Sequence, residues 1–267
     1  MKSNNTIALL TDFGYADTYV GVMKAVLLRI NPEARLIDLN HNIEPQNVKQ
    51  AAFDLLISVE YFPEGTTFLC GVDPGVGSSR SVICANTMDY NFVAPNNGLL
   101  SYVLDAFPAQ NIIIANKSEY YLDSVSNTFH GRDVLAPLAG YLSSGGDIEE
   151  LGREAEPNEV VRLKKIETTT VCDDCFTTEI LKADRFGNII TSTSQEYLHG
   201  LGKWEQIVVE VSDYKVKGIS KTFSDVGIGE AVAYIGSSGY LEVGLRDGNL
   251  WNRISRKPAE VRLRIFK

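Results

Sequence analysis

Long apolar runs are lacking in this 267-residue sequence. Its first strongly apolar segment, IALL at residues 7–10, is too short for the core of a signal peptide, and no later stretch reaches membrane-spanning length. We therefore expect a cytoplasmic protein with no membrane partner. Internal repeats, low-complexity tracts and heptad runs are also lacking, which argues against solenoid and coiled-coil architectures.

Cysteine is scarce, with four residues in the chain. Cys172 and Cys175 have the spacing of half a zinc site or of a redox pair, but a structural zinc site needs four ligands. The other two, Cys70 and Cys84, lie singly in apolar, strand-like runs. The two aspartates between Cys172 and Cys175 favour a raised thiol pKa, not a lowered one. We therefore predict neither a metal site nor a redox function for this pair.

Positive charge is also in short supply, because 25 Lys and Arg residues face 34 Asp and Glu residues, for a formal net charge of −9. This balance disfavours binding to a phosphate backbone, so we expect no nucleic-acid partner, and it mildly favours a cationic ligand. The composition, 44% hydrophobic and 22% charged, is ordinary for a soluble globular protein with a sizeable core. The length suits one large domain or two modest ones.

The first part of the chain alternates strand and helix signals. A buried strand is predicted over 6–11 and a helix over 19–30, where Asn31-Pro32 stops it. Apolar residues recur at helical spacing over 48–59, which predicts an amphipathic helix packed on a sheet. Further strands are predicted at 35–39, 66–72, 82–85, 91–94 and 112–115, and helices near 99–106 and 134–142. We therefore predict an N-terminal α/β/α domain with a largely parallel sheet over residues 1–160.

The pattern changes after the SSGG segment at 143–146 and the polar stretch 153–158. Strand candidates now follow one another without comparable helices, at 179–183, 189–192, 207–211, 231–235, 240–245 and 261–266. We predict a second, mostly antiparallel β domain over 166–267.

Two glycine-rich segments carry the strongest chemical signal. VDPGVGSSR at 72–80 supplies Asp73 and Arg80, and TFHGRD at 128–133 supplies His130. A carboxylate, a fixed cation and an imidazole can together activate water: the imidazole takes a proton, the carboxylate holds its orientation and tautomer, and the guanidinium positions the oxygen nucleophile. We name these three residues as catalytic candidates.

Each of these residues also has an ordinary structural interpretation. Asp73-Pro74-Gly75 has the composition of a β-turn, Arg80 could be a surface cation, and His130 could simply begin a helix. We expect the neighbouring Arg132 and Asp133 to form an intramolecular pair or start a helix, with no catalytic role.

Strand ends point to a second group of polar residues. Asp12 ends the first predicted strand and Asp73 follows the strand at 66–72, so both should lie at the carboxyl edge of the sheet, where open parallel sheets bind ligands. The segment DFGYAD at 12–17 is therefore interpreted as a ligand loop in which Asp12 and Asp17 bind substrate. The alternative is an N-cap of the following helix, which suits Asp17 better than Asp12. The remaining histidines, His41 and His199, are interpreted as structural or surface residues.

Eight blocks in order make the chain closely similar to the S-adenosylmethionine hydrolase family, also called S-adenosylmethionine hydroxide adenosyltransferases, which is related to fluorinases and chlorinases. They are LLTDFG (9–14), YVGVMK (19–24), YFP (61–63), GVDPGVG (71–77), APNNGLL (94–100), FHGRD (129–133), DRFGN (184–188) and SSGYLE (237–242). The resemblance covers nearly the whole chain. It implies an N-terminal α/β domain, a C-terminal β-barrel, and a homotrimer whose sites lie between one subunit's N-domain and its neighbour's C-domain.

The resemblance also implies site residues and a reaction. Its hydrolytic triad falls on Asp73, Arg80 and His130. The positions that match its ligand contacts are Asp12 for the ribose and Asn188, Tyr234, Ser238 and Glu242 around the adenine and methionine portions. The family usually has Asp where this chain has Asn96, and an alanine-containing sequence where this chain has Gly244-Leu245-Arg246. The chain departs from the family pattern at these two places.

The implied reaction is attack of activated water on the ribose 5′ carbon of S-adenosyl-L-methionine, yielding adenosine and methionine. The leaving group is a neutral thioether expelled from a sulfonium, so it needs neither a general acid nor a metal, and only the nucleophile needs help. We therefore expect no cofactor, which agrees with the absence of a ligand cluster around the three histidines.

Three other functions were weighed. A halogenase of the same superfamily would replace the Asp–Arg–His set with uncharged groups. A magnesium-dependent phosphatase with an aspartyl nucleophile would need a second carboxylate where Gly14 stands. In a non-catalytic nucleoside-binding protein the Asp–Arg–His set would have no obvious purpose. The residue pattern favours the hydrolase.

Overall fold

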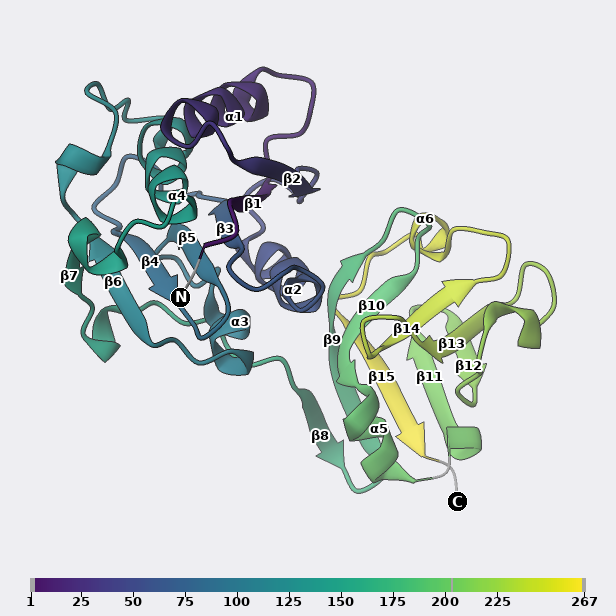
Figure 1. The fold of residues 1–267 in the computed structure, drawn as a ribbon. Coiled ribbons are helices and arrows are strands. Elements are labelled where there is room, and N and C mark those ends of the chain that lie inside the picture. Colours follow the sequence, from purple (N-terminus) through teal and green to yellow (C-terminus); the bar gives the residue numbers. More distant parts are fainter. Residues whose placement is uncertain (1–2, 203, 266–267) are drawn as a thin grey trace. The chain divides into compact units, whose positions relative to one another are not determined.

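The computed structural model describes residues 3–202 and 204–265 and divides the chain into two compact units, Met1–Lys164 and Lys165–Lys267 (Figure 1). The predicted fold class is confirmed. Unit 1 holds a largely parallel sheet with helices, and unit 2 holds an antiparallel sheet nearly closed into a barrel. No helix of the described residues is long and apolar enough to cross a bilayer.

Unit 1 is built on a seven-stranded sheet in the order β2-β1-β3-β5-β4-β6-β7. The first four strands in this order run parallel, whereas β4 runs antiparallel to both its neighbours and β7 is antiparallel to β6. The strands are β1 (Thr6–Thr11), β2 (Arg35–Asn40), β3 (Thr67–Gly71), β4 (Val82–Asn86), β5 (Asn91–Pro95), β6 (Asn111–Ala115) and β7 (Gly152–Glu154).

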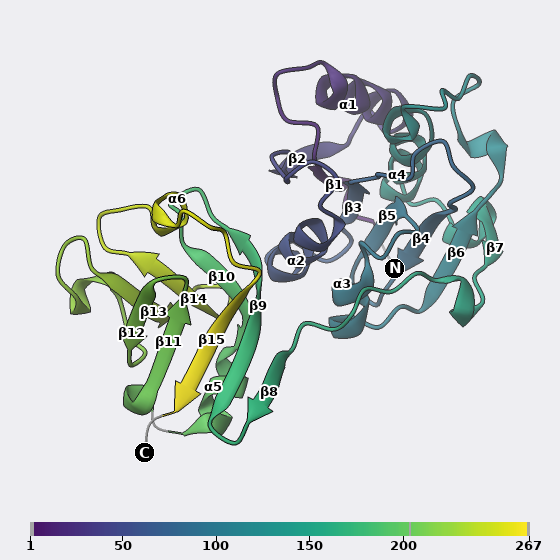
Figure 2. The ribbon, with the colours of Figure 1, turned by 180° about the vertical axis from the view of Figure 1, so that it is seen from behind.

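Helices cover both faces of this sheet. They are α1 (Tyr19–Ile30), α2 (Val48–Val59), α3 (Ser101–Ala106) and α4 (Ala136–Ser143). Helices α1 and α4 pack together, as do α2 and α3, and the view from behind in Figure 2 shows the same two pairs. Successive residues of β1 enter two different cores, Ile7 and Leu9 the core with α1 and α4, and Ala8 and Leu10 the core with α2 and α3. Burial on both faces explains why this strand reads as a continuous apolar run.

The topology gathers the candidate residues of unit 1 at one edge of the sheet. Strands β1 and β3 are paired in register, with Thr11 opposite Gly71, so Asp12 and Asp73 both follow strand ends at the carboxyl edge. Strand β4 starts at the same edge, because Val82 pairs with Pro95 at the end of β5. The segment that carries Arg80 into β4 therefore returns to this edge.

Unit 2 is an eight-stranded antiparallel sheet in the order β12-β11-β15-β9-β10-β14-β13, with β8 paired to β9. After β12, Ser220 donates its N–H to the carbonyl of Ala233 in β13 at 2.8 Å, which brings the two edges together. The strands are β8 (Thr168–Cys172), β9 (Cys175–Ala183), β10 (Ile189–Ser194), β11 (Ile207–Val211), β12 (Tyr214–Lys217), β13 (Ala231–Ile235), β14 (Tyr240–Leu245) and β15 (Glu260–Ile265). Two short helices, α5 (Gln195–Leu201) and α6 (Leu250–Arg253), accompany them.

Short one-turn elements connect these strands and helices. A π-helical turn at Gly131–Leu135 leads directly into α4, and 3₁₀ turns lie at Ser118–Tyr120, Ile148–Leu151, Pro157–Glu159, Trp204–Gln206 and Phe223–Asp225. The predicted helix over 134–142 is thus divided between the π turn and α4. The end of the last predicted strand, at 266, lies outside the described residues.

The cysteines form one disulfide and two buried thiols. Cys172 and Cys175 are bonded to each other across the tight turn between β8 and β9. Cys70 in β3 and Cys84 in β4 are fully buried, and burial raises the pKa of both thiols. The sequence did not predict the disulfide, because the same spacing suits metal-bound and free thiols.

Candidate active site

The segment between β3 and β4 folds back so that Arg80 reaches Asp73. Ser78 ties the turn together: its hydroxyl donates to the carbonyl of Gly75 at 2.7 Å and accepts the N–H of Arg80 at 3.2 Å. Gly77 has φ +76°, and a Cβ there would lie 2.3 Å from the carbonyl oxygen of Asn127. Glycine is required at this position both for the left-handed backbone and for the close approach of the segment that leads to His130.

Asp73 and Arg80 form a two-pronged ion pair. The Nε–H of Arg80 donates to Oδ1 of Asp73 at 3.0 Å, and Nη2 donates to Oδ2. The side chains are only 10% and 11% exposed. A pair with this geometry is rigid, because the planar guanidinium matches both carboxylate oxygens and little water competes for them.

His130 joins the pair through the same guanidinium. It lies immediately before the π turn, and Nη2 of Arg80 donates to its Nδ1 at 2.9 Å. Because Nδ1 accepts this bond, the neutral ring carries its proton on Nε2. Burial and the charge of Arg80 lower the pKa of His130, whereas Asp73 and Asp133 oppose this shift with smaller effects. The imidazole is therefore neutral at neutral pH.

The three catalytic candidates are thus close together, but in a different order from the one expected. We expected the carboxylate to orient the imidazole; instead Arg80 lies between them, and no hydrogen bond joins Asp73 to His130 within residues 3–202 and 204–265. The physical reason is the guanidinium's several donors, which let Nη2 serve a carboxylate and an imidazole at once.

A cavity of about 320 Å³ borders the Arg80–His130 contact. Its wall also includes Asn116, Tyr121 and Val125, which follow β6. The Tyr121 hydroxyl is held by the carbonyl of Ala115 at 2.6 Å. The guanidinium and the imidazole are therefore next to space that a small molecule such as water can enter.

The residues after His130 behave as expected. Arg132 and Asp133 form an ion pair, in which Nη2 of Arg132 donates to Oδ2 of Asp133 at 2.8 Å. Asp133 is fully buried and also accepts the N–H of Ser126 at 2.8 Å. Its carboxylate therefore stabilises the loop that precedes His130.

The two aspartates of the loop after β1 lie in different surroundings. Asp12 is half-buried and its Oδ2 accepts the backbone N–H of Gln46 at 2.8 Å. Asp17 is exposed, and the N-cap of α1 is Thr18, so the capping alternative for Asp17 is wrong.

Unit 2 brings Tyr234 and Glu242 together. They are directly opposite each other on β13 and β14, and the tyrosine hydroxyl donates to Oε2 of Glu242 at 2.7 Å. Burial raises the pKa of Glu242, which the bond from Tyr234 only partly offsets, and burial and Glu242 raise the pKa of Tyr234. In the described part of the chain the buried hydroxyl oxygen of Ser238 has no hydrogen-bond partner, a feature that suits a ligand contact.

Asn188 lies immediately before β10, and its side chain is close to Gly244, a position at which this chain departs from the family pattern. Its amide nitrogen donates to Oδ2 of Asp184 at 2.9 Å. A Cβ at Gly244 would lie 2.4 Å from Oδ1 of Asn188, so glycine at 244 leaves room for this amide. The second departing position, Asn96, bonds to the hydroxyl of Ser81 and to the carbonyl of Glu159.

Sequence reasoning assigned no role to Asp184. Its Oδ1 accepts the N–H groups of Phe186 and Asn188, at 2.9 and 2.8 Å, while Oδ2 accepts the Asn188 side chain. The signal was present, because an aspartate that opens a turn containing glycine commonly caps that turn.

Comparison with known proteins identifies the family. Residues 7–152 match the SAM hydroxide adenosyltransferase N-terminal domain and residues 178–261 match the C-terminal domain of the same family. The chain belongs to the SAM hydroxide adenosyltransferase family, as the sequence blocks predicted.

Several relatives cover nearly the whole chain. The (R)-S-adenosyl-L-methionine hydrolase of Thermus thermophilus is 36% identical over 91% of this chain and 92% of its own length, and that of Salinispora tropica is 33% identical over 97% of both. A fluorinase of Nocardia brasiliensis is 27% identical over 88% of both. The crystal structure of an uncharacterized conserved protein from Thermotoga maritima superimposes with a TM-score of 0.87 at 35% identity, covering 96% of this chain and 99% of that one.

Proposed function

We propose that this protein hydrolyses S-adenosyl-L-methionine to adenosine and L-methionine. The observation that carries the proposal is the cluster of Asp73, Arg80 and His130 next to a cavity. Relatives with 31–36% identity are named S-adenosyl-L-methionine hydrolases, whereas the fluorinases are more distant at 26–27%.

The reaction asks little of the leaving group. A bond forms between water oxygen and the ribose 5′ carbon, the carbon–sulfur bond breaks with its electron pair remaining on sulfur, and the positive sulfonium becomes a neutral thioether. One proton must leave the water. Catalysis therefore consists of aligning the water with the carbon–sulfur bond and of accepting that proton.

The contacts of the cluster suggest a division of roles. The Nδ1 lone pair of His130 is occupied by Arg80, so the ring offers its Nε2–H as a donor to the water oxygen. Asp73 keeps free lone pairs beside its bonds to Arg80, because each carboxylate oxygen can accept two hydrogen bonds. In this arrangement Asp73 is the proton acceptor, Arg80 holds both partners, and His130 positions the water and becomes a base only if its ring releases Arg80.

Substrate contacts are divided between the two units. In unit 1, Asp12 binds the ribose hydroxyls, and Asp17 of the same loop also contacts the substrate. In unit 2, the residues around the adenine and methionine portions are Asn188, Tyr234, Ser238 and Glu242. We assign the catalytic cluster to an N-terminal domain over 1–160 and these contacts to a C-terminal domain over 166–267. The protein functions without a metal in the cytoplasm as a homotrimer whose neighbouring subunits complete each site.

Incubation of the purified protein with S-adenosylmethionine in heavy-oxygen water tests the reaction. The expected products are methionine and adenosine labelled in its 5′ hydroxyl, because water attacks the ribose carbon. Unlabelled adenosine would reject the mechanism. A halogenated nucleoside formed preferentially at physiological chloride would show a halogenase, and adenosine binding without turnover a non-catalytic protein.

Light scattering tests the assembly. A homotrimer has three times the 29.4 kDa mass of the chain. An active monomer would contradict a site completed by neighbouring subunits.

A further inference from the structure

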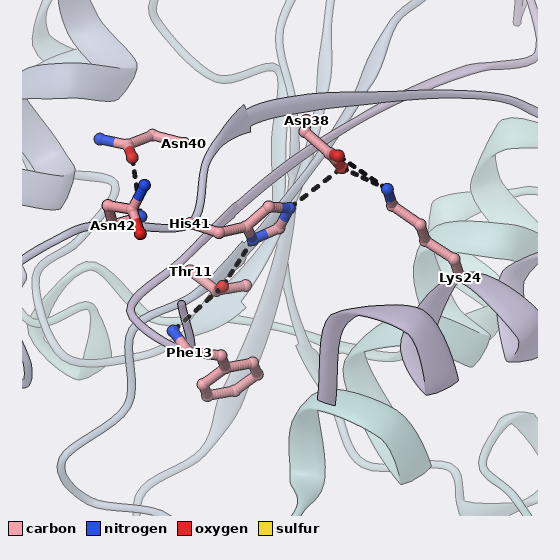
Figure 3. A network of polar contacts seen from close by, with 7 residues as sticks. All are labelled: Thr11, Phe13, Lys24, Asp38, Asn40, His41 and Asn42. Atoms are coloured by element: carbon pink, nitrogen blue, oxygen red, sulfur yellow. Dashed lines mark hydrogen bonds and ion pairs between the residues drawn. The ribbon is translucent and has the colours of Figure 1, made fainter. Parts of the chain in front are cut away.

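His41 is buried in a chain of polar contacts that the hydrolytic reaction does not use. Its side chain is fully buried in the turn after β2 (Figure 3). Its Nε2 lies 3.0 Å from Oδ1 of Asp38, and its Nδ1 lies 2.7 Å from the hydroxyl of Thr11. Lys24 of α1 donates to Asp38 at 2.7 Å. This series of polar contacts therefore links α1, β2, the turn after β2 and the last residue of β1.

The direction of each hydrogen bond follows from its partners. The carboxylate of Asp38 only accepts, so Nε2 of His41 carries the proton and Nδ1 accepts the Thr11 hydroxyl. The oxygen of Thr11 in turn accepts the N–H of Phe13 at 3.4 Å. Although burial opposes it, the bonds from Lys24 and His41 lower the pKa of Asp38, and burial lowers the pKa of His41. The hydrogen bonds require a neutral His41 ring and a charged Asp38 carboxylate, and these pKa shifts favour both forms.

His41 also connects two loops through backbone contacts. Its carbonyl accepts the N–H of Gly14 at 2.7 Å, which joins the loop after β1 to the turn after β2. Five residues later Gln46, at the strained φ of +68°, directs its N–H onto Oδ2 of Asp12 at 2.8 Å. Within residues 3–202 and 204–265, Oδ1 of Asp12 accepts no hydrogen bond. One oxygen of this carboxylate is anchored and the other is open.

We propose that His41 is a positioning residue that locks the loop after β1 onto the turn after β2, so that Asp12 presents Oδ1 to the ribose hydroxyls of a nucleoside. The inference rests on the proposed function, because that function supplies the ribose. It gives His41 a role in ligand selection, where sequence reasoning found only a structural or surface residue. Thr11 is the link, because its side chain touches His41 and its neighbour is Asp12.

The test compares adenosine with 2′,3′-dideoxyadenosine, which lacks the 2′ and 3′ hydroxyls but keeps the 5′ hydroxyl, by calorimetric titration of the full-length protein. The wild type should prefer adenosine by about tenfold or more, because hydrogen bonds to a charged carboxylate are lost with the dideoxy ligand. Thr11→Val, which keeps the shape but removes the hydroxyl, should reduce this preference at least about fivefold while changing dideoxyadenosine affinity by less than about twofold. Thr11→Ser retains the hydroxyl and should retain the preference.

His41→Leu should act like Thr11→Val, and His199→Leu, which removes the histidine of unit 2, is the matched control and should keep the preference. If His41→Leu fails to fold, the Thr11→Val and Thr11→Ser pair decides the question. If Thr11→Val weakens the binding of both nucleosides equally, or changes neither affinity, the positioning role of His41 is wrong. The hydrolase proposal still holds in that case if the wild type forms adenosine from S-adenosylmethionine. If the wild type binds the two nucleosides equally well, both the ribose role of Asp12 and this inference are wrong. If the wild type prefers adenosine but does not cleave S-adenosylmethionine, only the hydrolase proposal is refuted.

Discussion

Arg80 donates a hydrogen bond to Nδ1 of His130 across 2.9 Å. This contact fixes the tautomer of the imidazole and aligns the ring with a guanidinium that is itself held by two bonds to a carboxylate. The arrangement divides the tasks of the cluster among three side chains, each of which can be removed separately.

Removal of the carboxylate or the imidazole should affect chemistry more than binding. Asp73→Asn and His130→Ala should each lower turnover by about two to four orders of magnitude, because the first removes the proton acceptor and the second removes the donor that positions the water. Adenosine affinity, measured by calorimetry, should remain within about threefold, because neither residue is assigned to the nucleoside. Asp105→Asn is the matched control, since Asp105 pairs with Arg162 on the surface. Loss of adenosine binding in Asp73→Asn would contradict the assignment.

We expect that lysine at position 80 cannot take over the function of Arg80. The Arg80→Lys variant keeps the charge, but its single ammonium cannot bind both oxygens of Asp73 and Nδ1 of His130 in one plane. We expect turnover to fall by about ten- to a hundredfold, with the Michaelis constant changed much less. Steady-state kinetics would check this, and a fully active Arg80→Lys protein would show that the planar geometry is unnecessary.

The pH dependence of the reaction should reflect the neutral imidazole. The pKa of His130 lies below its ordinary value of 6.5, because burial and Arg80 disfavour the charged ring. Protonation would place an N–H on Nδ1 facing the N–H of Arg80. Activity should therefore be constant above pH 6.5 and fall as the pH drops through the lowered pKa.

Titration of His130 by nuclear magnetic resonance would measure this pKa directly. Arg80→Met should raise it, because the cation that lowers it is gone, and Asp73→Asn should lower it further, because Asp73 favours the charged ring. A pKa above 6.5 in the wild-type protein would contradict the geometry of the cluster.

The disulfide of unit 2 should be dispensable for catalysis. Replacing both Cys172 and Cys175 by serine should leave turnover within about twofold, because the pair lies in the turn between β8 and β9, outside the proposed site. The loss of unfolding free energy should be at most about 2 kcal/mol, because the bond closes a loop of only a few residues. Activity assays and denaturant unfolding check the two parts, and loss of a bound metal together with activity would show a metal site instead.

The sequence predicted the layers of this protein well because its signals are local. The end of α1 at Ile30 is set by Asn31-Pro32, and the spacing of apolar residues over Val48–Val59 gave α2 its bounds. The short strands β7, β8 and β12 were missed, because strands of three to five residues with exposed faces leave little apolar pattern.

The residues of the candidate site could be predicted from the sequence, but their hydrogen-bond partners could not. Asp73, Arg80 and His130 stand out in glycine-rich segments, yet nothing local shows that Arg80 lies between the other two. The same holds for His41, whose partner Thr11 lies 30 residues away in the sequence and meets it only because β1 and β2 pair side by side. Long-range pairing between side chains depends on tertiary contacts that residue spacing does not record.

The contact between Gly77 and the carbonyl of Asn127 joins the two segments that supply the cluster at a point where neither carries a functional group. Because position 77 has no side chain, the two segments can approach as closely as their backbones allow. An added methyl group at position 77 would push against the carbonyl of Asn127 without touching Arg80 or His130, so variants at this position offer a way to adjust the separation of the two segments while every polar side chain is retained.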